Sequence, residues 1–204
     1  TVEFAPRGAF APLTDMVGGG PFGLQPGQWT DDTSMALCLA ASLVETGRFD
    51  AADQMTRYVR WWREGYMSST GRCFDIGSTV SAALRRYERT GDPFSGSSDP
   101  HTAGNGSIMR LAPVPMRYSP DVAQVLAYSA ESSRTTHGAL TCIAACRYYG
   151  GLIVGAVRGA SKEELLAPRY APAAGHWERA PLCPDIDAVA AGSFLRKEPP
   201  QIVG

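Results

Sequence analysis

Two adjacent acids stand directly before a long apolar run in the segment WTDDTSMAL, residues 29–37. Thr30, Asp31 and Asp32 all carry short side chains that end in oxygen. Such oxygens are the ligands that Mg²⁺ and Mn²⁺ take in proteins. The same residues can also accept hydrogen bonds from the exposed N–H groups of a helix that begins here. A cap needs only one acid, but these residues alone leave both a metal site and a helix cap open.

A glycine-rich turn, AGNGSIMR at residues 103–110, contains the only asparagine of the chain. Gly104 and Gly106 flank Asn105 and lack a Cβ, so their backbone N–H groups could approach a ligand closely. Arg110 follows near enough to meet an anion. An ordinary turn explains the same residues, because Asn-Gly is a common turn pair. Taken alone, the segment favours the turn.

Two further segments place a polar side chain at the start of a helical pattern. Asp75 and Gly77 precede the helix expected from residue 78, where Asp75 could serve as the cap. His137 precedes an apolar run, and the positive end of a helix disfavours a charged imidazole there. We therefore expect His137 to be neutral, with either a ligand or a neighbouring loop as its hydrogen-bond partner. Glu3, near the start of the chain, has the local pattern of a solvated surface residue.

The hydrophobic pattern that must position these residues is helical throughout. Apolar residues recur at spacings of three and four, and Gly47 and Gly91 follow two of the patterns as stop signals. No segment alternates with period two and no internal repeat is present, so the sequence predicts an all-α fold with long loops. The expected helices cover residues 33–46, 50–66, 78–90, 120–132, 138–158, 161–166 and 185–196. The apolar face expected within 50–66 consists of Met55, Tyr58, Val59 and Trp62.

The composition is that of an ordinary globular protein of 204 residues. The formal net charge of −1 and the pI near 6.3 give no attraction to nucleic acid or to an anionic membrane. Five cysteines without close pairs argue against a disulfide framework, and no zinc-binding spacing is present. No signal peptide or membrane-spanning segment is evident. We expect a single domain over residues 1–204, a cytoplasmic location and a monomer.

The segments become far more specific when their order along the chain is considered. TVEF, GQWTDDTSMAL, FDIGSTVSAAL, GNGSIMRLAPVPMRY and THGALTC follow one another between residues 1 and 142. This ordered set resembles the ADP-ribosylglycohydrolase family, most closely its dinitrogenase reductase-activating glycohydrolase branch. The resemblance runs from residue 1 to about residue 158, and the remaining tail is compatible with the family but carries no motif.

The resemblance implies a compact orthogonal helical bundle with long functional loops and a dinuclear magnesium or manganese site in a central cleft. It implies hydrolysis of the glycosidic bond between ADP-ribose and a protein side chain such as arginine or serine. The expected substrate is therefore an ADP-ribosylated protein or an ADP-ribose derivative. Thr30, Asp31 and Asp32 are the implied metal ligands, and Glu3 is an implied catalytic acid beside Asp31 and Asp32. The implied substrate contacts are Asp75 and Gly77 at the ribose end, Gly104, Asn105, Gly106 and Ser107 at the diphosphate, and His137 on the adenosine side.

The sequence departs from the family pattern at both ends. The Gly-Asp-x-x-Gly segment that normally precedes the glutamate is missing, and so is the Asp-x-Asp-Thr motif that completes the second metal site. Asp185 and Asp187 have the right spacing, but Ala188 follows them and Pro184 precedes them, so we do not equate them with that motif. We expect a fragment of an active hydrolase, with weak or no activity as this chain alone. The alternatives are a degenerate relative that binds ADP-ribose or packs without turnover, and a helical interaction module whose partner surface is residues 57–67.

Overall fold

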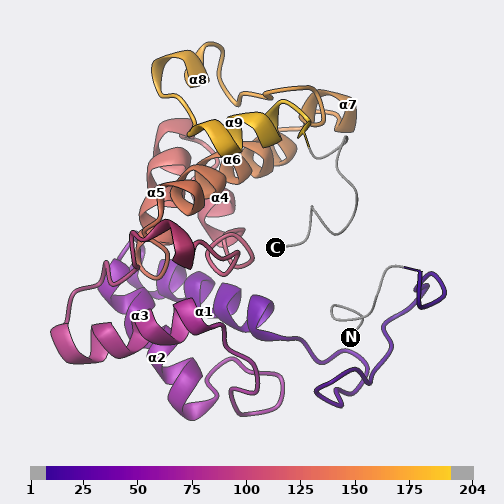
Figure 1. The fold of residues 1–204 in the computed structure, drawn as a ribbon, viewed down its shortest axis with the longest axis vertical. Coiled ribbons are helices and arrows are strands. Elements are labelled where there is room, and N and C mark those ends of the chain that lie inside the picture. The colour runs from indigo at the N-terminus through magenta and orange to yellow at the C-terminus, as the bar shows by residue number, and fades with distance from the viewer. Residues whose placement is uncertain (1–7, 194–204) are drawn as a thin grey trace.

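The computed structural model describes residues 8–193, and this part of the chain consists of helices joined by loops (Figure 1). Its β-structure is limited to two isolated bridges, Gly19–Leu24 and Ser97–His137. The predicted all-α fold class is therefore confirmed. The elements are α1 (Asp31–Thr46), α2 (Ala51–Glu64), α3 (Ser78–Thr90), the 3₁₀ turn η1 (Pro100–Thr102), α4 (Pro113–Arg117), α5 (Val122–Arg134), α6 (Leu140–Val157), α7 (Lys162–Leu165), α8 (His176–Arg179) and α9 (Pro184–Ala190).

The helices α1, α2 and α3 form the lower half of the molecule as drawn in Figure 1. α2 packs against both α1 and α3, and each of the three helices ends at a glycine in the left-handed conformation. Glycine suits these positions because it has no Cβ to oppose a positive φ. The main core cluster is formed by these three helices together with Leu111, α4 and α6, and consists of Met35, Cys38, Leu39, Leu43, Met55, Tyr58, Trp61, Val80, Leu84, Leu111, Val114 and Cys146.

The face by which α2 enters this core differs from the predicted one, because Met55 and Tyr58 are fully buried but Val59 and Trp62 are only partly buried. Trp61 is 1% exposed, whereas Trp62 is only partly buried. The guanidinium groups of Arg63 and Arg85 lie 3.6 and 5.4 Å from the centre of the Trp62 ring. These two cations lie over the part of the Trp62 ring that is not packed against the core. The same packing places Trp61 inside the molecule, so residues 57–67 do not present their aromatic side chains as one partner surface.

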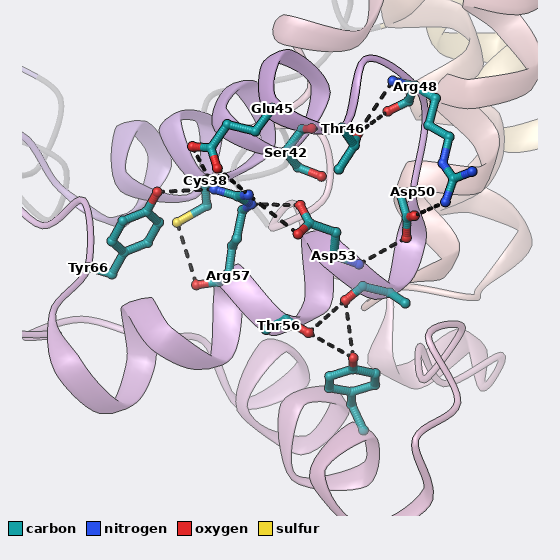
Figure 2. Close-up of polar contacts among 12 residues, drawn as sticks. Cys38, Ser42, Glu45, Thr46, Arg48, Asp50, Asp53, Thr56, Arg57 and Tyr66 are labelled. Atoms are coloured by element: carbon teal, nitrogen blue, oxygen red, sulfur yellow. Dashed lines mark hydrogen bonds and ion pairs between the residues drawn. The ribbon is translucent and has the colours of Figure 1, made fainter.

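A buried arginine joins α1 to α2, as Figure 2 shows. Arg57 donates to both carboxylate oxygens of Glu45, at 3.1 and 2.8 Å, and its Nε lies 2.6 Å from Asp53 Oδ2. Tyr66 accepts a further bond at 3.2 Å. The bonds to Glu45 and Asp53 raise the pKa of the Arg57 guanidinium above its usual range. The planar fork of arginine suits such paired contacts, so this residue holds two helices in one register.

The upper half of the molecule in Figure 1 is built on the antiparallel pair α5 and α6. Gly150 permits their close approach, because a Cβ there would collide with Oγ of Ser129. α6 is long and apolar enough to cross a membrane by length and composition alone, but it packs against α4, α5, α7 and α9. A second buried cluster forms on its outer side and consists of Leu126, Ala144, Trp177, Leu182 and Ala190.

Several helix boundaries differ from the predicted ones, and short elements were missed. Pro120 was predicted as the first helical residue of α5, but Asp121 is the cap and accepts from the N–H of Gln124 at 3.1 Å. Asp50 and Ser161 cap α2 and α7 in the same way, accepting from the N–H groups of Asp53 and Glu164. α4, α8 and η1 were not predicted, because each spans five residues or fewer and shows no hydrophobic period.

Candidate functional site

A pocket of about 200 Å³ brings together residues from four of the sequence segments described above. It lies between the starts of α1 and α3 on one side and the 104–109 loop and His137 on the other. Asp31, Gly77, Gly104, Asn105, Gly106 and His137 are the predicted site residues that line it. Residues more than a hundred positions apart therefore share one cavity, which their local sequence could not indicate.

The start of α1 is held in place by the turn that follows α2. Trp29 donates its indole N–H to the carbonyl of Met67 at 3.1 Å, and Ser69 donates its hydroxyl to the carbonyl of Trp29 at 2.6 Å. Thr30 occupies the N-cap position, but its side chain does not cap the helix. Its hydroxyl donates instead to Asp32 at 3.2 Å. Thr30, Asp31 and Asp32 thus gather three oxygen-bearing side chains at one helix start. Of these residues, Asp31 lines the pocket.

The start of α3 lines the same pocket as the start of α1. Gly77 is its N-cap and offers no side chain to the first turn, so the cap expected at Asp75 does not form. The first N–H groups of an α-helix have no partner within the helix. Ser78, Thr79 and Val80 carry these groups and line the pocket. The positive end of α3 is therefore directed at the cavity, an arrangement that suits an anion.

The glycine-rich turn is packed directly against the ring of His137. A Cβ added at Gly106 would lie 2.8 Å from Cε1 of His137, whereas one at Gly104 would lie 3.6 Å from Nε2. The carbonyl of Asn105 accepts the N–H groups of Ile108 and Met109, at 3.0 and 3.2 Å. Position 106 thus requires glycine because the imidazole ring of His137 lies so close. The local sequence does not indicate this contact.

His137 is 2% exposed and neutral, as the sequence predicts. Burial lowers the pKa of its imidazole to about 3, with a further contribution from the Arg110 charge. Its backbone N–H donates to the carbonyl of Ser133 at 2.7 Å, and its carbonyl accepts the Ser133 hydroxyl at 2.9 Å. These bonds hold the backbone that carries the ring, and burial rather than a helix dipole is the main cause of its neutrality.

Arg110 lies inside the protein and is not available to an anion in the pocket. Its side chain is 0% exposed and donates to the hydroxyls of Thr135 and Thr136 at 3.0 and 2.7 Å. The guanidinium also lies 4.6 Å from the centre of the Tyr58 ring. The expectation that Arg110 could meet a bound anion was wrong, because the sequence could not reveal which way a loop residue faces.

The other predicted residues occupy different positions. Ser107 is 1% exposed and its hydroxyl lies 3.0 Å from that of Ser133, so it faces the interior rather than the cavity. Asp75 does not line the pocket. The negative charges of Asp75 and Asp31 both act on the thiol of Cys73. Burial, with these two carboxylates, raises the pKa of the Cys73 thiol to about 11. Glu3 lies outside the described residues.

The residues at the start of α1 fit one part of a divalent-cation site. Thr30, Asp31 and Asp32 supply the hydroxyl and carboxylate oxygens that Mg²⁺ and Mn²⁺ prefer. However, residues 8–193 contain no group of three or more His, Cys, Asp or Glu side chains that could hold a metal ion. The donor chemistry is suitable, whereas the described residues gather too few metal-binding side chains around Asp31 and Asp32 for a dinuclear centre.

A second, apolar pocket of about 400 Å³ lies on the far side of α6, between α7 and α9. Its lining includes Tyr148, Leu152, Leu165 and Ile186 and offers little polar surface. A pocket of this kind can bind an apolar group but has no side chain placed for hydrolysis. We therefore take the smaller polar pocket as the candidate site, because chemistry requires convergent polar groups rather than volume.

Comparisons with known proteins place this geometry in context. The sequence model of the ADP-ribosylglycohydrolase family matches residues 1–202. An ADP-ribosylarginine hydrolase, Tri1 of Serratia proteamaculans, is 44% identical over 84% of this chain and 47% of its own length. The ADP-ribosyl-[dinitrogen reductase] glycohydrolase of Rhodospirillum rubrum is 33% identical over 75% of this chain and 51% of its own.

A solved structure agrees with these relatives. A chain of an ADP-ribosylglycohydrolase-related protein complex has a TM-score of 0.76 and 42% identity, covering 93% of this chain and 59% of its own length. The chain spans about half the length of the curated relatives that it matches.

Proposed function

Because the chain belongs to the ADP-ribosylglycohydrolase family, we propose that the protein hydrolyses the bond between ADP-ribose and a protein side chain, with arginine as the linked residue. The choice of arginine rests on relatives named ADP-ribosylarginine hydrolase, which are 44% and 46% identical to this chain. The observation that carries the proposal is the pocket in which Asp31, the start of α3, the 104–106 turn and His137 meet.

The geometry of the pocket supports binding of the diphosphate and the adjoining ribose. Its volume of about 200 Å³ is below the roughly 300–1,000 Å³ of most small-molecule sites, so it would hold only part of such a ligand. The uncapped start of α3 and the backbone of Gly106 would donate N–H groups to phosphoryl oxygens. The N–H of Gly104 already donates to the carbonyl of Thr102 at 3.0 Å. Asp31 would then lie toward the ribose end, where the bond is cleaved.

The carboxylates at the start of α1 supply the chemistry in this proposal. Cleavage at the anomeric carbon passes through an oxocarbenium-like state, whose positive charge nearby carboxylates stabilise. As water adds to that carbon, Asp31 would accept the proton that the water releases. The bond from the carbon to the arginine nitrogen breaks with its electron pair on the nitrogen, and the departing guanidine takes that proton from Asp31. Thr30, Asp31 and Asp32 would hold Mg²⁺ or Mn²⁺, which when bound lowers the pKa of a coordinated water. Glu3 remains a further candidate acid.

The test measures release of ADP-ribose from ADP-ribosyl-arginine and ADP-ribosyl-serine peptides, using the natural protein at its full length with Mg²⁺ or Mn²⁺. We expect release from the arginine peptide and a loss of rate of about a hundredfold or more in Asp31→Asn and Asp32→Asn. Asp185→Asn is the matched control, because this exposed acid of α9 lies outside the pocket. Faster release from the serine peptide would show that the choice of arginine is wrong.

A second function, binding of ADP-ribose without turnover, is favoured by one observation. The described part of the chain lacks a group of three or more metal-binding side chains. Calorimetric binding of ADP-ribose to a protein that releases none from either peptide would support this alternative. If the protein binds neither metal ion nor ADP-ribose, the assignment of the pocket itself is wrong.

A further inference from the structure

Arg110 is a buried cation that has no carboxylate partner among residues 8–193. Its Nη2 atom carries two protons and lies within hydrogen-bond distance of three acceptors, the carbonyl of Ser132 at 3.2 Å and the hydroxyls of Thr135 and Thr136 at 3.0 and 2.7 Å. The shortest of these bonds is the one to Thr136. Bonds from a charged donor are short and strong, so Arg110 takes one lone pair of the Thr136 hydroxyl as an acceptor.

The hydroxyl proton of Thr136 must then find an acceptor of its own. A threonine hydroxyl has one proton to donate and two lone pairs. In the described part of the chain, the group within reach of Oγ1 besides Arg110 is Nδ1 of His137, at 2.9 Å. If Nδ1 carried the proton of the ring, Thr136 would accept twice and its own proton would be buried without a partner. Such unsatisfied buried donors are rare in folded proteins.

We infer that Thr136 is a positioning residue which, held by Arg110, fixes the tautomer of His137 with its proton on Nε2. Nδ1 accepts from Thr136, and Nε2 presents a neutral N–H donor to the pocket. This atom has no hydrogen-bond partner among the described residues and lies beside the backbone of Gly104 and Gly106. It would donate to an acceptor atom of the ADP-ribosyl group, a role that rests on the proposed function, whereas the tautomer does not.

The geometry explains why the donor is a neutral histidine held by a chain of buried groups. The Thr135 hydroxyl donates its proton to the carbonyl of Ser132 at 2.8 Å. Of the two threonines, Thr136 is therefore the one that bonds to the His137 ring. The ring itself cannot shift toward the turn, because Gly106 is already in contact with it. The order of bonds from Arg110 to Thr136 to His137 therefore gives the site a donor of fixed direction.

The test reads the ring directly by long-range ¹H–¹⁵N correlation spectra of the chain labelled with ¹⁵N-histidine. The chain has three histidines, so His101→Gln and His176→Gln assign the signals by elimination. At neutral pH we expect a protonated Nε2 and an unprotonated, hydrogen-bonded Nδ1 in the wild type and in Thr136→Ser, which keeps the hydroxyl. Thr136→Val, which removes it, is expected to shift the tautomer ratio by about tenfold.

Titration with ADP-ribose separates this inference from the proposed function. The Nε2 signal is expected to move on binding, and Thr136→Val to weaken binding about 3- to 10-fold, while Thr136→Ser stays within about twofold. A wild-type ring protonated on Nδ1 overturns the inference, and this measurement suffices even if Thr136→Val does not fold. An unchanged tautomer in Thr136→Val also overturns it. ADP-ribose binding that leaves the Nε2 signal unmoved overturns the donor role. The expected tautomer without any ADP-ribose binding supports the role of Thr136 in fixing the tautomer and overturns the proposed function.

Discussion

His137 differs from the other two histidines of the chain in being almost completely buried next to a buried cation. Its neutrality follows from two costs, the loss of water around the ring and repulsion from Arg110. A group that stays neutral in the folded protein but becomes charged in the unfolded chain links folding to pH. The same residue therefore shapes the pocket and contributes to acid sensitivity.

The first prediction concerns the stability of His137→Gln as a function of pH. In the folded protein the pKa of His137 is about 3, below the ordinary histidine value of 6.5, so protons favour the unfolded chain between these values. Stability should be fully present above pH 6.5 and decrease as the pH falls toward 3, by a few kcal/mol on the scale of about 1.4 kcal/mol per pKa unit. Urea unfolding of His137→Gln at several pH values should show a shallower decrease.

The exposed His101 provides the control for this measurement. His101→Gln should keep the wild-type dependence of unfolding free energy on pH. If His137→Gln and the wild type lost stability in parallel between pH 6.5 and 3, another group would be responsible for the acid sensitivity.

At the scale of elements, the pocket is made by helix starts rather than by helix faces. Thr30 and Gly77 occupy the N-cap positions of α1 and α3, and neither side chain caps its helix. By contrast, Asp50 and Asp121 cap α2 and α5, which do not line the pocket. The start of α3 therefore keeps N–H groups available for a ligand, and a glycine at the N-cap costs only about a few tenths of a kcal/mol in helix stability.

The second prediction compares two glycines of the same turn. Gly106→Ala would place a methyl group 2.8 Å from the His137 ring, whereas Gly104→Ala would make an ordinary contact at 3.6 Å. We expect Gly106→Ala to destabilise the protein by about 1–3 kcal/mol and to weaken ADP-ribose binding, because the turn or the ring must move. Gly104→Ala should be within about 0.5 kcal/mol of the wild type. Thermal unfolding and calorimetry measure both effects, and equal losses in the two variants would contradict the steric explanation.

At the scale of the whole molecule, the candidate site depends on how the two halves meet. α1 and α3 belong to the lower half in Figure 1, while His137 follows α5 in the upper half. The short helix α4 contacts α1, α5 and α6 and so connects the halves. The backbone bond from Gly138 to the carbonyl of Ser97, at 2.9 Å, joins the loop before the glycine-rich turn to the segment that carries His137.

The third prediction tests the contact between α1 and α2. Arg57→Lys keeps the charge but loses the fork that bonds Glu45, Asp53 and Tyr66, so we expect a loss of about 1–3 kcal/mol in unfolding free energy. Arg48→Lys is the control, because Arg48 is 76% exposed and has one ionic contact, with Asp50. Chemical denaturation should separate the two variants. Equal stability of Arg57→Lys and the wild type would show that the charge alone holds the helices.

Much of the secondary structure could be predicted from the sequence, because a helix with one buried face carries apolar residues at the helical period. α1, α2, α3, α5 and α6 were all expected, and glycines at 47 and 91 end the helices as predicted. Where neighbours decide burial, prediction failed. Trp61 rather than Trp62 enters the core, and Arg110 faces inward to two threonines 25 and 26 residues away. Nothing in the local pattern encodes such partners.

The sequence by itself determined the all-α class, the main helices and, through the order of its motifs, the ADP-ribosylglycohydrolase family. These properties depend on local periodicity and on residue order, both of which can be read along the chain. Only the tertiary structure decided that Asp31, the uncapped start of α3, the 104–106 turn and His137 share one pocket. It also decided that Gly106 serves the His137 ring and that Arg110 acts on that ring through Thr136. Such relations arise where distant segments pack together, because burial and hydrogen-bond partners depend on contacts in space rather than on neighbours in sequence.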